Sequence, residues 1–165
     1  MANEFFHASG MLLAPGSVVL PGNFGRIIHK LGPAHNLYQY ETALELSRVV
    51  KYPQYLSRLG CVFLWASYGD YLAFRAQDES YFRSMVMYKV EIVDLEAPCL
   101  ISRMDLCRPN VLPNYDMEWA NKYWDAAIER TGKEISSMDM QPGIIGIREI
   151  LCNSSVRIIE SIDSL

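Results

Sequence analysis

Three segments that lie far apart in the chain carry polar side chains next to apolar strand patterns. They are Phe5–Ser9, Val62–Ser67 and Arg148–Cys152. In the first, aromatic residues lead to the imidazole of His7 and the hydroxyl of Ser9, which can hold a ligand by hydrogen bonds. In the third, Glu149 begins an apolar run, and its carboxylate can stabilise a developing positive charge. Binding and charge stabilisation are therefore the chemistry to consider.

Several common motifs are absent from the sequence. No glycine-rich loop has the spacing of a Rossmann or P-loop site, and no HExxH, GxSxG or kinase pattern occurs. The four cysteines (Cys61, Cys99, Cys107 and Cys152) form no CxxC pair, and the three histidines supply no zinc spacing. We expect ordinary thiols, no metal, and none of the familiar dinucleotide folds.

Length and charge narrow the class of protein. A chain of 165 residues predicts a single domain, residues 1–165, which buries about 68–70% of its unfolded surface. A net charge of -4 disfavours nucleic acid as a partner. The N-terminus lacks a basic signal-peptide region, and no apolar stretch approaches the roughly 18–20 residues of a membrane span. Reduced thiols are typical of cytoplasmic proteins. We therefore expect the protein to act in the cytoplasm, or in a target cell after delivery as an effector.

The elements that must position these residues follow from hydrophobic periodicity and turn signals. Strands are expected at Glu4–His7, Ser17–Leu20, Cys61–Trp65, Met85–Val93, Ile147–Cys152 and Val156–Ile162. Helices are expected at Asn36–Lys51, Gly69–Ala76 and from a cap at Asp116 to about Arg130. Loops are expected at Pro21–Gly25, around Pro98, Pro109 and Pro113, and over Thr131–Gly146. The short hairpin connections predict an α+β fold with largely antiparallel pairing.

The two long helices are expected to bury one face each. The residues expected to point inward are Ala43, Leu46, Val49 and Val50 on the first helix, and Trp119, Tyr123, Ala127 and Trp124 on the second.

Taken together, the segments resemble the ADP-ribosyltransferase superfamily. The N-terminal part, FFHAS followed by LAPGS and a second Pro-Gly, is similar to the opening of the small rifampin ADP-ribosyltransferases. Those chains begin with an aromatic-His-Gly-Thr strand and a Leu-x-Pro-Gly-Asp turn, so Ala8 and Ser9 depart from the pattern. The later segments resemble related bacterial domains. REILC, a short polar turn and VRII resemble the glutamate-bearing strand and its partner strand.

The resemblance implies an ADP-ribosyltransferase-like fold of split, mainly antiparallel sheets with flanking helices, and NAD as substrate. Glu149 would be the catalytic carboxylate, and His7 would bind a ribose hydroxyl of NAD, with Ser9 beside it. Phe63 stands where the rifampin-type pattern has a stacking tyrosine, and Tyr68 is its substitute.

The resemblance also implies less direct roles for three polar residues. Arg26 would contact the pyrophosphate, and Ser57 and Arg58 would contact phosphate or structure a turn. The arginine-modifying members carry a second glutamate two positions before the catalytic one, where this chain has Ile147. A single-glutamate chemistry follows, and arginine is disfavoured as the acceptor, which stays unknown and is a protein or a small molecule.

Other interpretations of the same residues stay open. The protein is a mono-ADP-ribosyltransferase or NAD glycohydrolase, or a nucleotide- or protein-binding module on the same fold without turnover. A cysteine-dependent hydrolase would use Cys61 or Cys107 with His7 or His35. A partner-binding domain would touch no nucleotide at all.

Overall fold

The computed structural model describes residues 4–77, 83–107, 117–138 and 146–162. Its strands are β1 (Phe5–Ser9), β2 (Val18–Val19), β3 (Val62–Trp65), β4 (Val86–Ile92), β5 (Pro98–Arg103), β6 (Ile128–Thr131), β7 (Arg148–Cys152) and β8 (Val156–Ser161). Its α-helices are α1 (Asn23–Leu31), α2 (Tyr38–Lys51), α3 (Tyr68–Gln77), α5 (Glu118–Asp125) and α6 (Gly132–Ser137). Short 3-10 turns lie at η1 (Gly32–Ala34), η2 (Arg58–Gly60) and η3 (Met104–Leu106).

All the described strands join one sheet in the order β2-β8-β4-β1-β3-β7-β5-β6. Every neighbouring pair is antiparallel, which confirms the α+β class and the predicted pairing. The sheet has its shortest strand pairing in the middle, between β1 and β3. β1 pairs with β4 over its whole length, but it pairs with β3 only at Phe6 and Trp65. Apart from this link, no residue pair joins β1 to β3 among the described residues.

The connection from β7 to β8 shows how the sheet curves. Only Asn153–Ser155 separate the two strands in sequence, yet three strands lie between them in the sheet. The predicted short connection is correct, but the hairpin pairing that it suggested is wrong. The two halves of the sheet instead fold toward each other, because Leu64 and Ile150 from one half share an apolar cluster with Val90 and Ile158 from the other. Burying this shared face is what favours the curvature.

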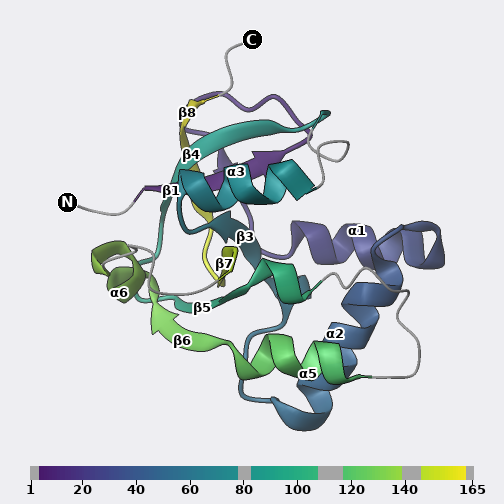
Figure 1. The fold of residues 1–165 in the computed structure, drawn as a ribbon. Helices are drawn as coiled ribbons and strands as arrows, with labels where there is room; N and C mark the ends of the chain where they lie inside the picture. The colour runs from purple at the N-terminus through teal and green to yellow at the C-terminus, as the bar shows by residue number, and fades with distance from the viewer. Residues whose placement is uncertain (1–3, 78–82, 108–116, 139–145, 163–165) are drawn as a thin grey trace.

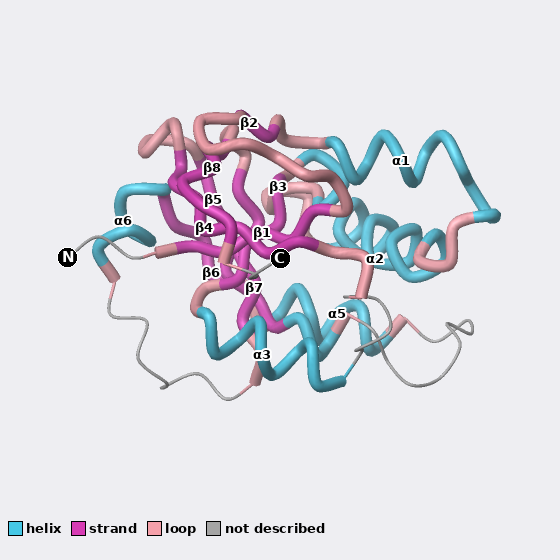
Figure 2. The backbone as a smooth tube through the Cα atoms, turned by 90° about the horizontal axis from the view of Figure 1, so that it is seen from above, coloured by secondary structure: helices cyan, strands magenta, loops and turns pink. Residues whose placement is uncertain are grey.

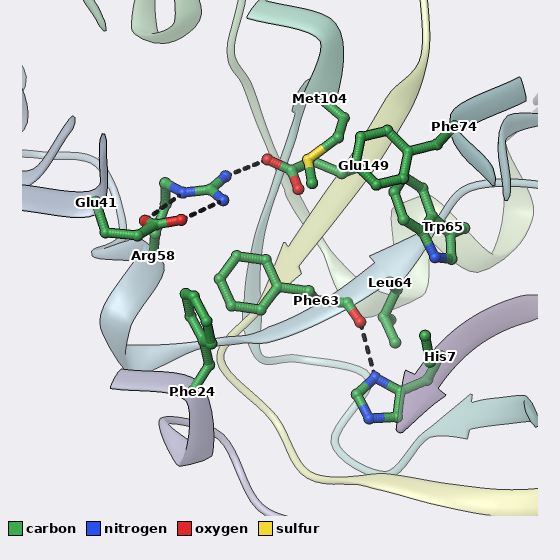
Figure 3. Close-up of a pocket in the computed structure, with 11 residues that line it drawn as sticks. His7, Phe24, Glu41, Arg58, Phe63, Leu64, Trp65, Phe74, Met104 and Glu149 are labelled. Carbon is green, nitrogen blue, oxygen red and sulfur yellow. Dashed lines mark hydrogen bonds and ion pairs between the residues drawn. The ribbon is translucent and has the colours of Figure 1, made fainter. Parts of the chain in front are cut away.

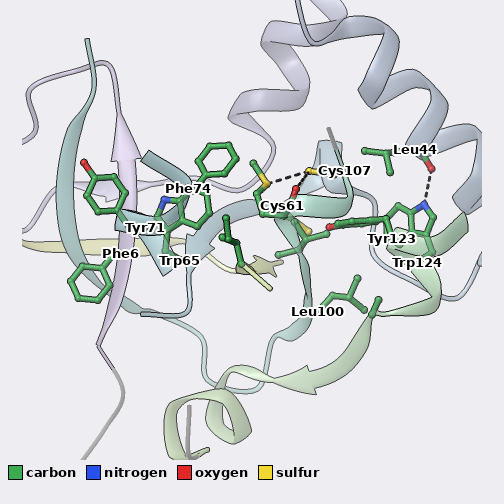
Figure 4. Packing of buried hydrophobic residues seen from close by; sticks show 14 of the residues in the cluster. Phe6, Leu44, Cys61, Trp65, Tyr71, Phe74, Leu100, Cys107, Tyr123 and Trp124 are labelled. Atoms are coloured by element: carbon green, nitrogen blue, oxygen red, sulfur yellow. Dashed lines mark hydrogen bonds between the residues drawn. The ribbon is translucent and has the colours of Figure 1, made fainter. Parts of the chain in front are cut away.

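The helices cover the sheet unevenly. Figures 1 and 2 show α1 and α2 to one side of the strands and α6 at the opposite side. A second apolar cluster lies between the sheet and helices α2, α3 and α5. Figure 4 shows Trp65 and Phe74 toward one end of this cluster and Tyr123 and Trp124 toward the other. None of the described helices combines the length and apolar character needed to cross a bilayer.

Local patterns predicted β1, β2, β3, β4, β7 and β8, but they missed β5, β6, α1 and α6. The predicted strand at Met85–Val93 is β4, and the predicted strand at Cys61–Trp65 is β3. The loop predicted at Pro21–Gly25 contains the start of α1, and the loops predicted after Pro98 and Thr131 contain β5 and α6. β5 was missed because it is buried almost throughout and therefore shows no polar alternation.

The late helix is shorter than predicted. It ends at Asp125, and β6 begins at Ile128, within the range predicted as helical. Tyr123 and Trp124 are fully buried, as predicted. The predicted cap Asp116 lies outside the described residues, as do Pro109 and Pro113.

The inward face predicted for α2 is wrong. Leu46, Val49 and Val50 are 55%, 54% and 68% exposed, whereas Glu41 and Ser47 are buried. The inward face of the helix combines the fully buried Leu44 with polar contacts. Ser47 donates to Asn121 Oδ1 on α5 at 2.8 Å, and the Trp124 indole on α5 donates to the Leu44 carbonyl at 2.9 Å, while Glu41 binds a buried arginine. The periodicity of apolar residues alone therefore does not predict which face of α2 is buried.

A close backbone approach holds α1 against η2. A Cβ atom at Gly25 would lie 1.9 Å from the Leu59 carbonyl oxygen, which belongs to the backbone and cannot rotate away. We expect Gly25→Ala to lower the free energy of unfolding by about 3 kcal/mol or more. Gly60→Ala on the facing turn is the control, because its Cβ would meet nothing within 4 Å. Urea unfolding measures both, and equal stability of the two variants would contradict this packing.

Candidate functional site

A cavity of about 140 Å³ opens beside β3, near the link between β1 and β3. Aromatic side chains form much of its wall, and four ionisable side chains join them (Figure 3). The aromatic residues are Phe24, Phe63, Trp65 and Phe74, and the ionisable residues are His7, Glu41, Arg58 and Glu149. An engineered apolar cavity of about 150 Å³ binds benzene, so this space accommodates roughly one aromatic ring.

His7 reaches the cavity from β1 and bridges the gap to β3. Its Nδ1 lies 3.0 Å from the Phe63 carbonyl oxygen. Because a carbonyl oxygen only accepts, Nδ1 carries the proton and Nε2 keeps its lone pair. Burial lowers the pKa of His7, against the raising effect of the bond to Phe63, so the ring is neutral at pH 7. Nε2 has no hydrogen-bond partner within the described part of the chain, and it is an acceptor available to a ligand hydroxyl.

Glu149 reaches the same cavity from the central strand β7. It pairs with Trp65 on β3 and with Ser102 on β5, so both of its neighbours in the sheet are fixed. Arg148, the residue before Glu149, is bound to Asp70 on α3. The Asp70 carboxylate accepts from the Arg148 backbone N–H at 2.9 Å and from its guanidinium at 2.8 Å. The position of the Glu149 carboxylate is therefore set from two strands and one helix.

A buried network of hydrogen bonds surrounds the Glu149 carboxylate. Arg58 and the Tyr123 hydroxyl both donate to its Oε1, the hydroxyl at 2.6 Å. Arg58 also donates to both carboxylate oxygens of Glu41, at 2.9 and 3.0 Å, and to the Tyr123 oxygen at 2.7 Å. The Oε2 of Glu149 has no partner among the described residues, which leaves it as the oxygen that can accept from a ligand.

The charges of this network stabilise one another. Burial opposes the charged form of Arg58, but the carboxylates of Glu149 and Glu41 raise its pKa well above the ordinary value, so the guanidinium stays charged. Burial raises the pKa of the Tyr123 hydroxyl, against the lowering effect of Arg58, so it stays protonated and donates. The guanidinium also lies 4.8 Å from the centroid of Phe63, within the range of a cation–π contact.

The structure brings four of the predicted site residues to the cavity: His7, Arg58, Phe63 and Glu149. Ser9, Arg26, Ser57 and Tyr68 do not line it. Ser9 accepts from the Met11 backbone N–H, and Ser57 caps η2. Arg26 is exposed and binds Asn23, and Tyr68 is 43% exposed and packs against Phe6.

Several residues of the site are not singled out by sequence patterns: Phe24, Glu41, Trp65 and Phe74 line the cavity, and Tyr123 joins its hydrogen-bond network. The sequence places Phe24 at an expected loop and Tyr123 in the expected core. Glu41 carries no local signal, because its position on α2 resembles that of any exposed helical glutamate. For Phe24, the Gly22-Asn23 pair before it is a local signal for the start of a helix. Gly22 has φ 83°, and α1 begins at the next residue.

Part of the chain matches the model of a protein family. The model of the family described as "Protein of unknown function (DUF2441)" matches residues 19–138, which is more than half of the chain. The chain belongs to the DUF2441 family. The part of the chain that the DUF2441 model matches contains Phe24, Glu41, Arg58 and Phe63. His7 and Glu149 lie outside the matched residues. No curated protein matches the chain.

The neutral state of His7 has a consequence for stability. The folded protein holds this imidazole with a pKa below the unfolded value of 6.5. As the pH falls below 6.5 the unfolded chain binds a proton that the folded chain does not, so stability is lost. We expect the wild type to lose up to about 1 kcal/mol more than His7→Gln between about pH 7.5 and about pH 5.5. Urea unfolding at the two pH values measures this.

The matched control is His29→Gln, which changes an exposed histidine on α1. It removes a histidine that lies outside the cavity, so its unfolding at the two pH values is the reference for His7→Gln. An unchanged pH dependence in His7→Gln would contradict the assigned neutral state.

Proposed function

We propose that this protein binds NAD at the cavity between β1 and β3 and transfers its ADP-ribose group to an acceptor, or to water. The observation that carries the proposal is that His7 and Glu149, which resemble the binding histidine and catalytic glutamate of the ADP-ribosyltransferases, line one cavity. The two residues are far apart in sequence, and no local pattern requires that they meet. The proposed fold is accordingly an ADP-ribosyltransferase-like arrangement of this antiparallel sheet.

The size and lining of the cavity support nicotinamide as the group inside it. A volume of about 140 Å³ suits one flat ring, with the remainder of the dinucleotide lying outside. Phe24 and Phe63 meet edge to face, with ring centroids 5.2 Å apart, and offer apolar surfaces to such a ring. The Nε2 of His7 is an acceptor suited to a ribose hydroxyl.

In the proposed reaction, the bond between the nicotinamide nitrogen and the ribose anomeric carbon breaks, and its electron pair leaves with nicotinamide. The transition state resembles an oxocarbenium ion, as in glycoside cleavage. The Glu149 carboxylate stabilises the positive charge that develops on the sugar, and Oε2 accepts from a ribose hydroxyl. The acceptor or water then forms a bond to the anomeric carbon and releases a proton.

The experiment that tests this function is incubation of the purified protein with NAD, followed by chromatographic measurement of nicotinamide. Release of nicotinamide above the rate of the protein-free control supports the proposal. Thermal unfolding with NAD, nicotinamide and ADP-ribose detects binding separately, because a ligand that binds only the folded state raises the melting temperature. If the protein neither releases nicotinamide nor shows a melting-temperature shift at millimolar ligand, the proposal is overturned.

One observation favours a second candidate, a nucleotide-binding module without turnover. Glu149 is only 2% exposed, and its Oε1 is already engaged by Arg58 and Tyr123. A carboxylate held in this way stabilises the fold whether or not the protein turns over a substrate. A thermal shift with NAD but no nicotinamide release from the wild type would identify this function.

The cysteine-dependent alternative has less support. Burial raises the pKa of Cys61 to about 12, so its thiol is protonated and is a poor nucleophile at neutral pH. Cys107 is also buried. All four cysteines are buried thiols, which supports our proposal that the protein acts in a reducing compartment such as the cytoplasm.

A further inference from the structure

The cavity contains an unequal set of charges. Two carboxylates, those of Glu41 and Glu149, face the single guanidinium of Arg58, so the formal charges of the three groups sum to one negative charge. Their side chains are at most 4% exposed, so water screens them poorly. Among the described residues that line the cavity, the remaining ionisable side chain is His7, which is neutral and supplies no compensating charge.

A buried charge without a counter-ion is unfavourable, and a cation that enters the cavity removes this cost. The rest of the lining favours the same kind of ligand. Phe24, Phe63, Trp65 and Phe74 present aromatic rings, whose faces attract cations. A neutral ring would gain the apolar contacts but not the electrostatic attraction.

We propose that Glu41 is a specificity-determining residue, which makes the cavity select a flat aromatic cation over a neutral ring of the same shape. The guanidinium of Arg58 carries one positive charge and therefore balances only one of the two carboxylates. Removing the charge of Glu41 leaves Arg58 and Glu149 as a neutral pair. The inference rests on the proposed function for the identity of the ligand, since the nicotinamide ring of NAD is such a cation. The charge argument applies to any flat cation that fits.

The test uses two unreactive probes, the N-methylnicotinamide cation and neutral nicotinamide, with Kd measured by ligand-observed NMR titration. We expect the wild type to bind the cation about tenfold more tightly than nicotinamide. Glu41→Gln should lose most of this preference through weaker binding of the cation, with the Kd of nicotinamide changed by about twofold or less. Equal Kd values for the two probes in the wild type would overturn the inference without any variant.

Two further variants separate charge from geometry. Arg58→Lys keeps the charge sum but loses the paired hydrogen bonds to Glu41, so the preference for the cation should survive. Glu45→Gln changes a glutamate on the same helix that binds Arg48 and Ser57 outside the cavity, and it should also keep the preference. Loss of the preference in Arg58→Lys and in Glu41→Gln alike would show that packing, not charge, is responsible.

The outcomes also separate this inference from the proposed function. A preference for the cation without nicotinamide release from NAD would support the charged site and contradict the enzymatic function. Nicotinamide release with equal binding of the two probes would support the function and overturn the role of Glu41.

Discussion

Glu149→Gln is expected to lower the rate of nicotinamide release from NAD by about 10²–10³-fold. The substitution removes the negative charge that stabilises the developing positive charge on the ribose, but it keeps an oxygen that can accept from Arg58 and Tyr123. The remaining Glu41 and Arg58 form a neutral ion pair, so the fold should tolerate the change. The rate is measured by chromatography, and the melting temperature is measured on the same samples.

The control for this variant is Glu160→Gln, which removes a glutamate that is 59% exposed and distant in the sheet from β7. It should release nicotinamide at the wild-type rate. If Glu149→Gln keeps full activity while the wild type is active, Glu149 is a structural residue and the proposed mechanism is wrong. If Glu149→Gln unfolds, Glu149→Asp provides the second measurement, because it keeps the charge and shortens the side chain.

The largest effect on stability is expected from Arg58→Met. Removing the guanidinium leaves the carboxylates of Glu41 and Glu149 buried with no cation, and breaking a buried ion pair in this way typically costs about 3–5 kcal/mol. Urea unfolding at neutral pH should show a loss of this size. The matched control is Arg157→Met, which removes an arginine that binds Glu91 at a similar distance but with about half of its side chain exposed. Its stability should change little, because water screens the pair.

A second substitution shows whether charge causes the loss. Adding Glu41→Gln to Arg58→Met removes one of the two unpaired carboxylates, and this double variant should recover part of the lost stability. A double variant that is less stable than Arg58→Met would mean that packing around Arg58, rather than uncompensated charge, is responsible.

Several parts of the fold could be predicted because the information is local. Residues of β4 alternate between the two faces of the sheet, and β3 is a short apolar run between turn signals, so a few neighbouring residues suffice to recognise each strand. The prediction of β7 in turn put Glu149 on a strand. The resemblance singled out His7 and Glu149, and the structure places both at one cavity.

What only the tertiary structure decided is which polar groups are buried together. Arg58 meets Glu41, Tyr123 and Glu149 across 17, 65 and 91 residues of sequence, and no periodicity records such separations. Their hydrogen bonds and their attraction to the Arg58 guanidinium offset part of the cost of burying the carboxylates, with Glu41 on the inward face of α2 and Val49 and Val50 exposed to solvent. The sequence by itself determined the central strands, whereas long-range pairing of charges determined the lining of the cavity.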